Sequence, residues 1–236
     1  MILHNYNDLA GTTQLWDTSD SFEQYQKNLA NPAQRARMEQ HGHVDAVIEY
    51  RFNSEGFRGP EIDNPDCLCF GCSFTMGTGV SEDEAWPNQF AKLSGRTTAN
   101  LGHAGSSNDT AVRFALHYIP LLKPRVAVWV QTDPHRLEII NQGINIVDNI
   151  LAGSVDSTPY KNDVYVKQWI ASGINQDLNL AKNTLSFRQI CADHQVQCVI
   201  VPNRRVHEIN DRSARDLMHP SKNVQKKLAE IVSQLV

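Results

Sequence analysis

A serine that lies among small residues, near the end of an apolar segment, is the first candidate for chemistry in this chain. Residues 66–74 read DCLCFGCSF, and Ser73 in this segment is followed by Thr75, Gly77 and Gly79. A serine on a strand-to-helix turn has an exposed hydroxyl, and its own backbone N–H can help to stabilise an oxyanion. The other interpretation is a glycine-rich turn with a capping serine. The first interpretation predicts that Ser73 is a nucleophile.

A nucleophilic serine needs a base, and Asp216 and His219 offer one. They lie three residues apart in DLMHPS, directly before an amphipathic C-terminal segment. In this arrangement the carboxylate can hold one ring nitrogen of the imidazole while the other nitrogen points across the site. A lone histidine near a helix start is more often a surface or capping residue, so the pair gains its meaning from Ser73.

The segment NLGHAGSSND, residues 100–109, again places glycines and small polar residues after a predicted strand. Glycine lets the backbone approach a substrate closely, and its N–H is an unhindered hydrogen-bond donor. Many turns between a strand and a helix look the same. In combination with Ser73, we expect the N–H of Gly105 to contribute to an oxyanion hole.

The composition narrows the classes of protein to consider. The 236 residues carry a formal net charge of -4, which gives no electrostatic reason to expect nucleic acid or an anionic membrane as a partner. No apolar run is long enough to span a membrane, and no basic-then-apolar secretory signal is visible at the N-terminus. The five cysteines are odd in number, and four lie in strand-like segments, so we expect reduced thiols and a cytoplasmic protein.

The sequence carries none of the common cofactor and metal motifs. The sequence contains no phosphate-cradling GxxxxGK[ST] segment, no zinc-type cysteine pairs and no HExxH. His41, His43 and Asp45 lie close together in the sequence, but no further ligand follows at a spacing typical of metal sites. We therefore interpret them as part of an ordinary loop. We expect neither a cofactor nor a metal.

From residue 66 onward, apolar strand-like runs alternate with segments of helical spacing. The strand-like runs are short and suit buried parallel strands. Strands joined by helices of this length imply right-handed crossovers and a doubly wound parallel sheet. The strands are expected over 66–74, 97–102, 125–132 and 197–203, and the helices over 85–95, 108–123, 180–195 and 221–236.

Two regions do not follow this alternation. Residues 1–63 are predicted to be an N-terminal extension packed on a main domain of residues 64–236, with one or two short helices over 20–40 and a strand over 47–52. Residues 133–179 are predicted to be an insertion or lid over one end of the sheet.

Three blocks taken together resemble the SGNH/GDSL hydrolases. They run from Gly71 to Gly77, from Asn100 to Gly105 and from Asp216 to Pro220, in the order of that family. The resemblance implies a three-layer α/β/α flavodoxin-like fold and hydrolysis of esters, often acetyl or acyl groups on carbohydrates or lipids. It also implies an acyl-enzyme on Ser73 and no cofactor.

The chain departs from the family pattern at two places. The usual Gly-Asp-Ser is Gly71-Cys72-Ser73 here, and we expect Cys72 to point into packing on the opposite side of the strand end. The Gly-x-Asn-Asp block appears as Val130-Gln131-Thr132-Asp133, so that Thr132 occupies the place of the asparagine that donates to the oxyanion.

A threonine hydroxyl can donate one hydrogen bond but has a shorter reach than an amide. Gln131 supplies an amide only if its side chain turns inward, and Asn108 resembles the missing block but is placed as a helix cap. The predicted oxyanion hole therefore consists of Ser73, Gly105 and Thr132.

These observations predict a serine hydrolase acting on a small-molecule or glycan ester. Asp133 and Arg136 belong to a charged group with His135 and Glu138 that could bind a polar part of the substrate, or form a solvated ion-pair face instead. Two other classes remain open: a weak or inactive glycan-binding module, which Thr132 favours, and a virion or surface-assembly component. The oligomeric state is left open. The candidate substrate-binding residues are Asn108, Gln131, Asp133 and Arg136.

Overall fold

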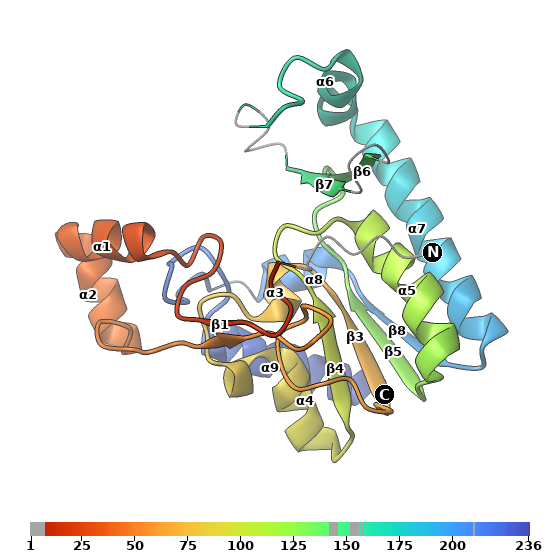
Figure 1. Ribbon diagram of the computed structural model, residues 1–236, viewed down its shortest axis with the longest axis horizontal. Coiled ribbons are helices and arrows are strands. Elements are labelled where there is room, and N and C mark those ends of the chain that lie inside the picture. Colours follow the sequence, from red (N-terminus) through yellow and green to blue (C-terminus); the bar gives the residue numbers. More distant parts are fainter. Residues whose placement is uncertain (1–7, 142–145, 152–155, 157, 210) are drawn as a thin grey trace.

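A parallel four-stranded sheet forms the centre of the protein (Figure 1). The computed structural model describes residues 8–141, 146–151, 156, 158–209 and 211–236. The strands lie in the order β4-β3-β5-β8, so the chain starts near the middle of the sheet, moves to one edge and then returns to the other side. Their bounds are Cys67–Gly71 for β3, Thr98–Gly102 for β4, Val126–Val130 for β5 and Gln197–Val201 for β8.

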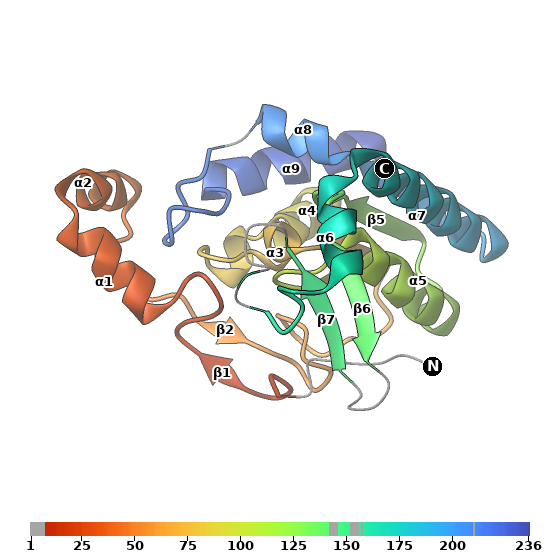
Figure 2. The ribbon, with the colours of Figure 1, turned by 90° about the horizontal axis from the view of Figure 1, so that it is seen from above.

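The two faces of the sheet alternate along each strand, as the period of two requires. Leu68, Phe70 and Trp129 pack on one face against helices α5 and α7, whereas Cys69 and Val128 pack on the other against α4 and α9. These helices form the outer layers on the two sides of the sheet (Figure 2). The predicted three-layer α/β/α fold is confirmed. The helices span Trp86–Ser94 for α4, Asn108–Leu122 for α5, Gly173–Asp193 for α7 and Lys222–Leu235 for α9.

Most predicted boundaries agree with the structure to within two or three residues, because local signals fix them. Gly95 ends α4 in the left-handed conformation, and the hydroxyl of Ser221 caps α9. Helix α7 is the exception, since it begins at Gly173 and not at residue 180. Its first turns are mostly polar, and their apolar residues Ile174 and Leu178 are exposed. The start of the helix is fixed by the hydroxyl of Ser172, which accepts from the Asn175 N–H.

The described part of the N-terminal region forms a small layer of its own. Strands β1 (Thr13–Gln14) and β2 (Tyr50–Arg51) pair antiparallel, and helices α1 (Phe22–Ala30) and α2 (Pro32–His41) project to one side of the sheet (Figure 2). The predicted strand over 47–52 is therefore shorter than expected. The boundary at residue 63 stays a prediction.

Arg58 ties this region to the main body. Its guanidinium is 2% exposed and donates to the carbonyl oxygens of Gly77 and Val80 in the loop after β3, and to that of Glu49. Burial lowers the pKa of Arg58, although the nearby Tyr50, Glu82 and aspartates oppose this. Because the two terminal nitrogens of this guanidinium donate to these three carbonyls, they fix the relative position of the segments that they join.

The region after β5 stands at the carboxyl end of the sheet (Figure 1). It contains the antiparallel pair β6 (Leu137–Asn141) and β7 (Ile146–Ile150) and the helix α6 (Val164–Ala171), none of which was predicted as an element. A small apolar cluster of Leu137, Ile150, Val166 and Trp169 holds these elements together. Parts of the predicted insertion, namely residues 142–145, 152–155 and 157, lie outside the described residues.

Three short helical segments also escaped prediction: α3 (Ser73–Met76), a 3₁₀ turn at Glu82–Glu84 and α8 (Asn203–Glu208). Each is too short to show a periodic apolar pattern. Among the described helices, none combines the length and the apolar character needed to cross a membrane.

Candidate active site

Ser73 is the first residue of α3, directly after β3, at the carboxyl end of the sheet. The short helix packs closely on the neighbouring strand β4: a Cβ atom at Gly102 would lie 2.5 Å from the backbone nitrogen of Met76. Only glycine permits this approach. Trp86 donates through Nε1 to the Thr75 hydroxyl, at 3.2 Å, and the Asn100 amide donates to the Thr75 carbonyl. The turn that presents Ser73 is therefore fixed on several sides.

The structure brings Asp216 and His219 to this serine. The Ser73 Oγ lies 2.8 Å from His219 Nε2, and His219 Nδ1 lies 2.6 Å from Asp216 Oδ2. Both distances are within the range that a nucleophile, a base and an orienting carboxylate require. The structure thus brings these three side chains together, although Ser73 and His219 lie 146 positions apart in the sequence.

The loop between Asp216 and His219 is shaped around the carboxylate. The N–H groups of Met218 and His219 donate to Asp216 Oδ1, at 2.9 and 3.0 Å. Leu217, the residue after Asp216, has a positive φ of 59°, an uncommon conformation for a residue other than glycine. Such strain persists only where the surroundings enforce it, and it often marks functional loops.

The electrostatic environment keeps Asp216 ionised. Burial by itself would raise the pKa of this carboxyl, whose side chain is fully buried. The hydrogen bond and charge of His219, together with donation from Met218 N–H and the Ser19 hydroxyl, outweigh burial and lower the pKa below its ordinary value. A buried carboxylate that accepts this many hydrogen bonds can stabilise an imidazolium that forms beside it.

Ser19 is a site residue that the sequence did not indicate. Its hydroxyl donates to Asp216 Oδ2 at 2.8 Å and lies 3.4 Å from His219 Nδ1. It belongs to the N-terminal region, 197 residues before Asp216, and no motif surrounds it. Only the folded chain relates the two positions.

The side chains of Ser73 and His219 open into a cavity of about 370 Å³. Six separate segments line it: the N-terminal region, the segments after β3, β4, β5 and β7, and the loop before α9. A larger hollow of about 740 Å³ lies near β2 and the start of α4, but no nucleophile–base pair lines it. The smaller cavity is therefore the candidate site, and it is lined by Thr18, Ser19, Ser73, Phe74, Ala104, Gly105, Asp133, Arg136, Leu151, Arg212, Met218 and His219.

Two backbone N–H groups are available at the serine. Those of Ser73 and Gly105 donate no hydrogen bond to another group among the described residues, and both residues line the cavity. Gly105 has a positive φ of 75°, which favours glycine at this position. Unpaired donors beside a nucleophile are what an oxyanion hole requires.

Two of the three side chains considered as further donors, those of Asn108 and Gln131, are engaged elsewhere. The Asn108 amide donates to the Thr132 carbonyl and accepts from the Thr132 N–H, both at 3.0 Å. Gln131 donates to the hydroxyl of Thr184 on α7. Neither Asn108, Gln131 nor Thr132 is among the residues that line the cavity.

One of these side chains, Asn108, lies beside the cap of α5. The sequence predicts a cap for α5 at Ser107 or Asn108, and the structure has Ser107 in this role, since its hydroxyl accepts from the Thr110 N–H. Asn108 is the first residue of the helix, and its side chain joins the helix start to the loop after β5 because both of its polar atoms match the Thr132 backbone.

The charged residues after β5 divide into two groups. Asp133 and Arg136 line the cavity, and Arg136 donates to the Ser106 carbonyl at 3.1 Å. Burial would raise the pKa of Asp133, but hydrogen bonds from Asn203 and His207 outweigh it and lower that pKa. Glu138 forms a buried ion pair with Arg113, at 2.8 Å, away from the cavity lining.

Two other predicted features are placed as follows. Cys72 is 4% exposed and caps α3 without a side-chain hydrogen bond. His43 bonds through Nε2 to the Ser213 carbonyl, at 2.7 Å. Within the described ranges no group of three or more histidine, cysteine or acidic side chains is arranged to hold a metal ion.

Comparisons with known proteins give similar structures but no similar sequences. No family model and no curated protein matches the chain. A putative lipolytic protein of the G-D-S-L family from Desulfitobacterium hafniense is 13% identical with a TM-score of 0.37, over 72% of this chain and 98% of that one. The psychrotrophic esterase EstA from Pseudoalteromonas sp. is 12% identical with a TM-score of 0.36, over 72% and 95%.

A family 3 carbohydrate esterase from Clostridium thermocellum is 14% identical with a TM-score of 0.36, over 71% of this chain and 92% of that one. All three are named as lipolytic proteins or esterases.

Proposed function

We propose that this protein is a serine hydrolase that cleaves carboxylic esters through an acyl-enzyme on Ser73. The observation that carries the proposal is the continuous chain of contacts from Ser73 Oγ to His219 Nε2, at 2.8 Å, and from His219 Nδ1 to Asp216 Oδ2, at 2.6 Å, at the wall of a cavity. A nucleophile at a cavity wall, a base and a buried carboxylate in this order form the arrangement of a hydrolytic triad.

In the first half of the reaction, Ser73 Oγ attacks the ester carbonyl carbon while His219 Nε2 takes the hydroxyl proton. The carbonyl oxygen becomes an oxyanion. As the tetrahedral intermediate collapses, the bond to the alcohol oxygen breaks and the imidazolium returns its proton to that oxygen. Asp216 accepts a hydrogen bond from His219 Nδ1–H throughout, so the proton stays on Nδ1 and Nε2 is free to act as the base.

In the second half, a water molecule takes the place of the alcohol. His219 removes one of its protons, and the hydroxide oxygen attacks the acyl carbon of the Ser73 ester. Collapse breaks the bond to Ser73 Oγ, which takes the proton back from His219, and the carboxylic acid leaves. No cofactor takes part in either half.

The N–H groups of Ser73 and Gly105 stabilise the oxyanion in this proposal. Both line the cavity and have no other partner among the described residues. Removing one oxyanion donor costs roughly 3–4 kcal/mol in serine hydrolases, so two fixed backbone donors supply a large share of the stabilisation. The side chains of Thr132 and Gln131 contribute no donor in this proposal.

The cavity suits an ester with a short acyl group and a polar alcohol such as a sugar. Its volume of about 370 Å³ lies at the small end of ligand sites, and charged side chains from Asp133, Arg136 and Arg212 share its wall with Phe74, Leu151 and Met218. Asp133 and Arg136 are proposed to contact polar groups of the alcohol, as their types suggested.

A fluorophosphonate probe tests the proposal. It should form an adduct that mass spectrometry locates on Ser73, and Ser73→Ala should lose both the adduct and the hydrolysis of p-nitrophenyl acetate. Cys72→Ala is the matched control, since it changes the neighbouring nucleophilic side chain, and it should be labelled like the wild type. If labelling were lost in Cys72→Ala and kept in Ser73→Ala, the nucleophile would be Cys72 and the proposal would be wrong.

The same experiment distinguishes a hydrolase from a glycan-binding module without turnover. A protein that keeps the cavity without turnover would bind a glycan ester but leave the probe unreacted. No specific contact favours that alternative, because Thr132, the residue that suggested it, is absent from the cavity lining.

A further inference from the structure

We infer that Ser19, supplied by the N-terminal region, is a positioning residue that holds Asp216 and His219 in their working geometry. The inference rests on the proposed function. It assigns a role in the chemistry to a part of the chain that the three sequence blocks do not include.

Ser19 contacts the Asp216 carboxylate directly. Asp216 Oδ2 is 2.6 Å from His219 Nδ1 and 2.8 Å from Ser19 Oγ, so the imidazole and the serine hydroxyl share one carboxylate oxygen. The other oxygen, Oδ1, accepts from the N–H groups of Met218 and His219. With Ser19 in place, each oxygen of the buried carboxylate accepts two hydrogen bonds, and the carboxylate is held against rotation.

A tight turn presents Ser19 to Asp216. Asp17 and Asp20 exchange backbone hydrogen bonds, at 3.1 and 3.0 Å, and close a tight turn around Thr18 and Ser19. Thr18 has a positive φ of 50°, which is unfavourable for a β-branched residue. Among the described residues other than glycine, Thr18 and Leu217 are two of five with a positive φ, and both adjoin a residue of the Ser19–Asp216 contact. Backbone strain on both sides of one contact indicates that the contact is enforced by its surroundings.

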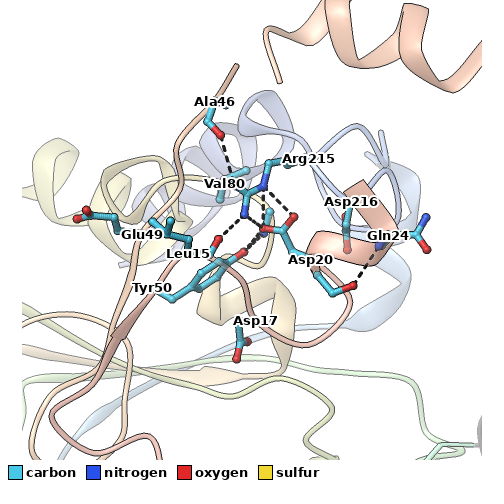
Figure 3. Close-up of polar contacts among 12 residues, drawn as sticks. Leu15, Asp17, Asp20, Gln24, Ala46, Glu49, Tyr50, Val80, Arg215 and Asp216 are labelled. Atoms are coloured by element: carbon cyan, nitrogen blue, oxygen red, sulfur yellow. Dashed lines mark hydrogen bonds and ion pairs between the residues drawn. The ribbon is translucent and has the colours of Figure 1, made fainter. Parts of the chain in front are cut away.

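The buried ion pair between Arg215 and Asp20, here called the clamp, holds this turn in place (Figure 3). Arg215, the residue before Asp216, donates to both carboxylate oxygens of Asp20, with the shortest distance 2.7 Å, and both side chains are 1% exposed. The Arg215 guanidinium also donates to the Leu15 carbonyl and lies over the Trp16 ring at 4.0 Å. Ser19 is followed in the sequence by Asp20, and Asp216 is preceded by Arg215. The buried Asp20–Arg215 ion pair thus lies directly beside the Ser19–Asp216 contact.

Tyr50 completes the clamp from strand β2. Its hydroxyl donates to Asp20 at 2.6 Å and accepts from the Gly79 N–H at 2.8 Å. Burial raises the pKa of Tyr50, so the phenol remains a donor. Gly79 lies in the loop that follows Ser73, and the clamp therefore joins the Asp20 turn to the nucleophile's side of the site as well.

A further contact approaches Asp216 from helix α1. The Asn28 side chain, which is fully buried, donates to the backbone carbonyl of Asp216 at 3.2 Å. The N-terminal region thus contacts both the side chain and the backbone of Asp216. Loss of the Ser19 hydroxyl alone should leave the clamp intact, which makes a single substitution a clean test.

The test compares Ser19→Ala with Ser19→Thr and with Ser21→Ala. Ser19→Ala removes the donor to Asp216, and Ser19→Thr restores a hydroxyl at the same position. Ser21→Ala is the matched control, because Ser21 lies two residues away and caps α1 by accepting from the Gln24 N–H. Two measurements are made on each full-length variant: the pH profiles of kcat and KM for p-nitrophenyl acetate, and the proton resonance of His219 Nδ1–H by NMR.

For Ser19→Ala we expect kcat to fall about tenfold, the effect of one hydrogen bond to a charged group, with KM changed by less than about twofold. The acidic limb of the profile should move to higher pH, because a carboxylate with fewer donors attracts the imidazolium more strongly. The Nδ1–H resonance should shift. Ser19→Thr should recover most of the rate, and Ser21→Ala should lower only the melting temperature.

The two readouts separate this inference from the proposed function. If the wild type turns over esters but Ser19→Ala keeps its kcat and pH profile, the inference is wrong and the proposed function stands. If the wild type shows no turnover, the proposed function is wrong, and the NMR resonance decides: an unchanged His219 signal in Ser19→Ala overturns the inference, whereas a shifted signal supports it. A loss in Ser21→Ala equal to that in Ser19→Ala would reduce Ser19 to a structural role and also overturn it.

Discussion

The two sides of the site around Ser73 are built in different ways. On the side of His219, the proposed base, side chains from distant segments converge: Ser19, Asp216 and His219 are hydrogen-bonded to one another and to the backbone around them. On the oxyanion side, the available donors are the backbone N–H groups of Ser73 and Gly105. Side chains near that side, such as Asn108, bond to the backbone and not toward the serine.

This difference indicates where the site is sensitive to substitution. A side-chain network loses a defined group with each mutation, whereas backbone donors survive any substitution that keeps the turn. We therefore expect large effects on the side of the base and small effects from the polar side chains behind the oxyanion hole. The following predictions proceed from the largest expected effect to the smallest.

Asp216→Asn should give the largest loss, about 10³–10⁴-fold in kcat, because an amide can stabilise the wrong imidazole tautomer and carries no charge for the imidazolium. The measurement is steady-state hydrolysis of p-nitrophenyl acetate. Asp211→Asn is the control, since Asp211 lies in the same loop and accepts from the Ser213 hydroxyl. A loss of less than tenfold in Asp216→Asn would show that the base works without this carboxylate.

The same substitution has a consequence for stability against acid. The pKa of Asp216 is lowered in the folded protein, so its ionised form stabilises the fold above the ordinary aspartate pKa, and this contribution disappears as the pH falls through the folded value. Asp216→Asn cannot titrate. Its free energy of unfolding, measured by urea at several acidic pH values, should therefore fall less steeply with decreasing pH than that of the wild type.

Asp20→Asn tests the clamp behind the base. The ion pair with Arg215 is 1% exposed on both sides, and leaving one charge of such a pair without its partner costs roughly 3–5 kcal/mol. The amide keeps part of the hydrogen bonding, so we expect the lower end of this range in urea unfolding, together with a loss of kcat through Ser19. Arg51→Met, which removes an exposed ion pair with Glu82, should change the free energy of unfolding by less than about 1 kcal/mol. Equal effects of the two substitutions would contradict the clamp.

Asn108→Ala is the corresponding test on the oxyanion side. It removes both hydrogen bonds to the Thr132 backbone, whose buried N–H and carbonyl then lack these partners. The free energy of unfolding should fall by about 2–3 kcal/mol, while kcat should fall by less than about tenfold, because the site donors lie elsewhere. Asn108→Asp keeps the acceptor and loses the donor, and should lie between the two. A rate loss as large as that of Asp216→Asn would mean that Asn108 acts on the oxyanion directly.

On both sides, the sequence predicts the elements far better than the contacts between distant segments. The sheet, its layers and the meeting of Ser73 with His219 follow from local patterns, because the carboxyl ends of parallel strands share one edge. Hydrophobic alternation and terminal residues such as Gly95 and Ser221 locate the elements to within a few residues.

What could not be predicted depends on contacts between segments far apart. Ser19 has no local signal, since an ordinary polar turn becomes part of the site only when Arg215 pairs with Asp20. Likewise, the direction of the Asn108 and Gln131 side chains is set by partners on the loop after β5 and on α7. Residue type correctly indicated amide donors in this region, but no pattern in the chain specifies what an amide donates to.

Thr132→Val should give the smallest effect and is the sharpest test of the backbone-built oxyanion hole. The substitution removes the hydroxyl at nearly constant shape and leaves the backbone bonds to Asn108 in place. Because Thr132 is absent from the cavity lining, kcat for p-nitrophenyl acetate should change by less than about twofold, well below the roughly tenfold that one hydrogen bond represents. Thr132→Asn, which introduces the longer amide that the family pattern has here, should not accelerate acylation unless its side chain enters the cavity. A tenfold loss in Thr132→Val would instead place this hydroxyl on the oxyanion, and the oxyanion side would then rely on a side chain as the side of the base does.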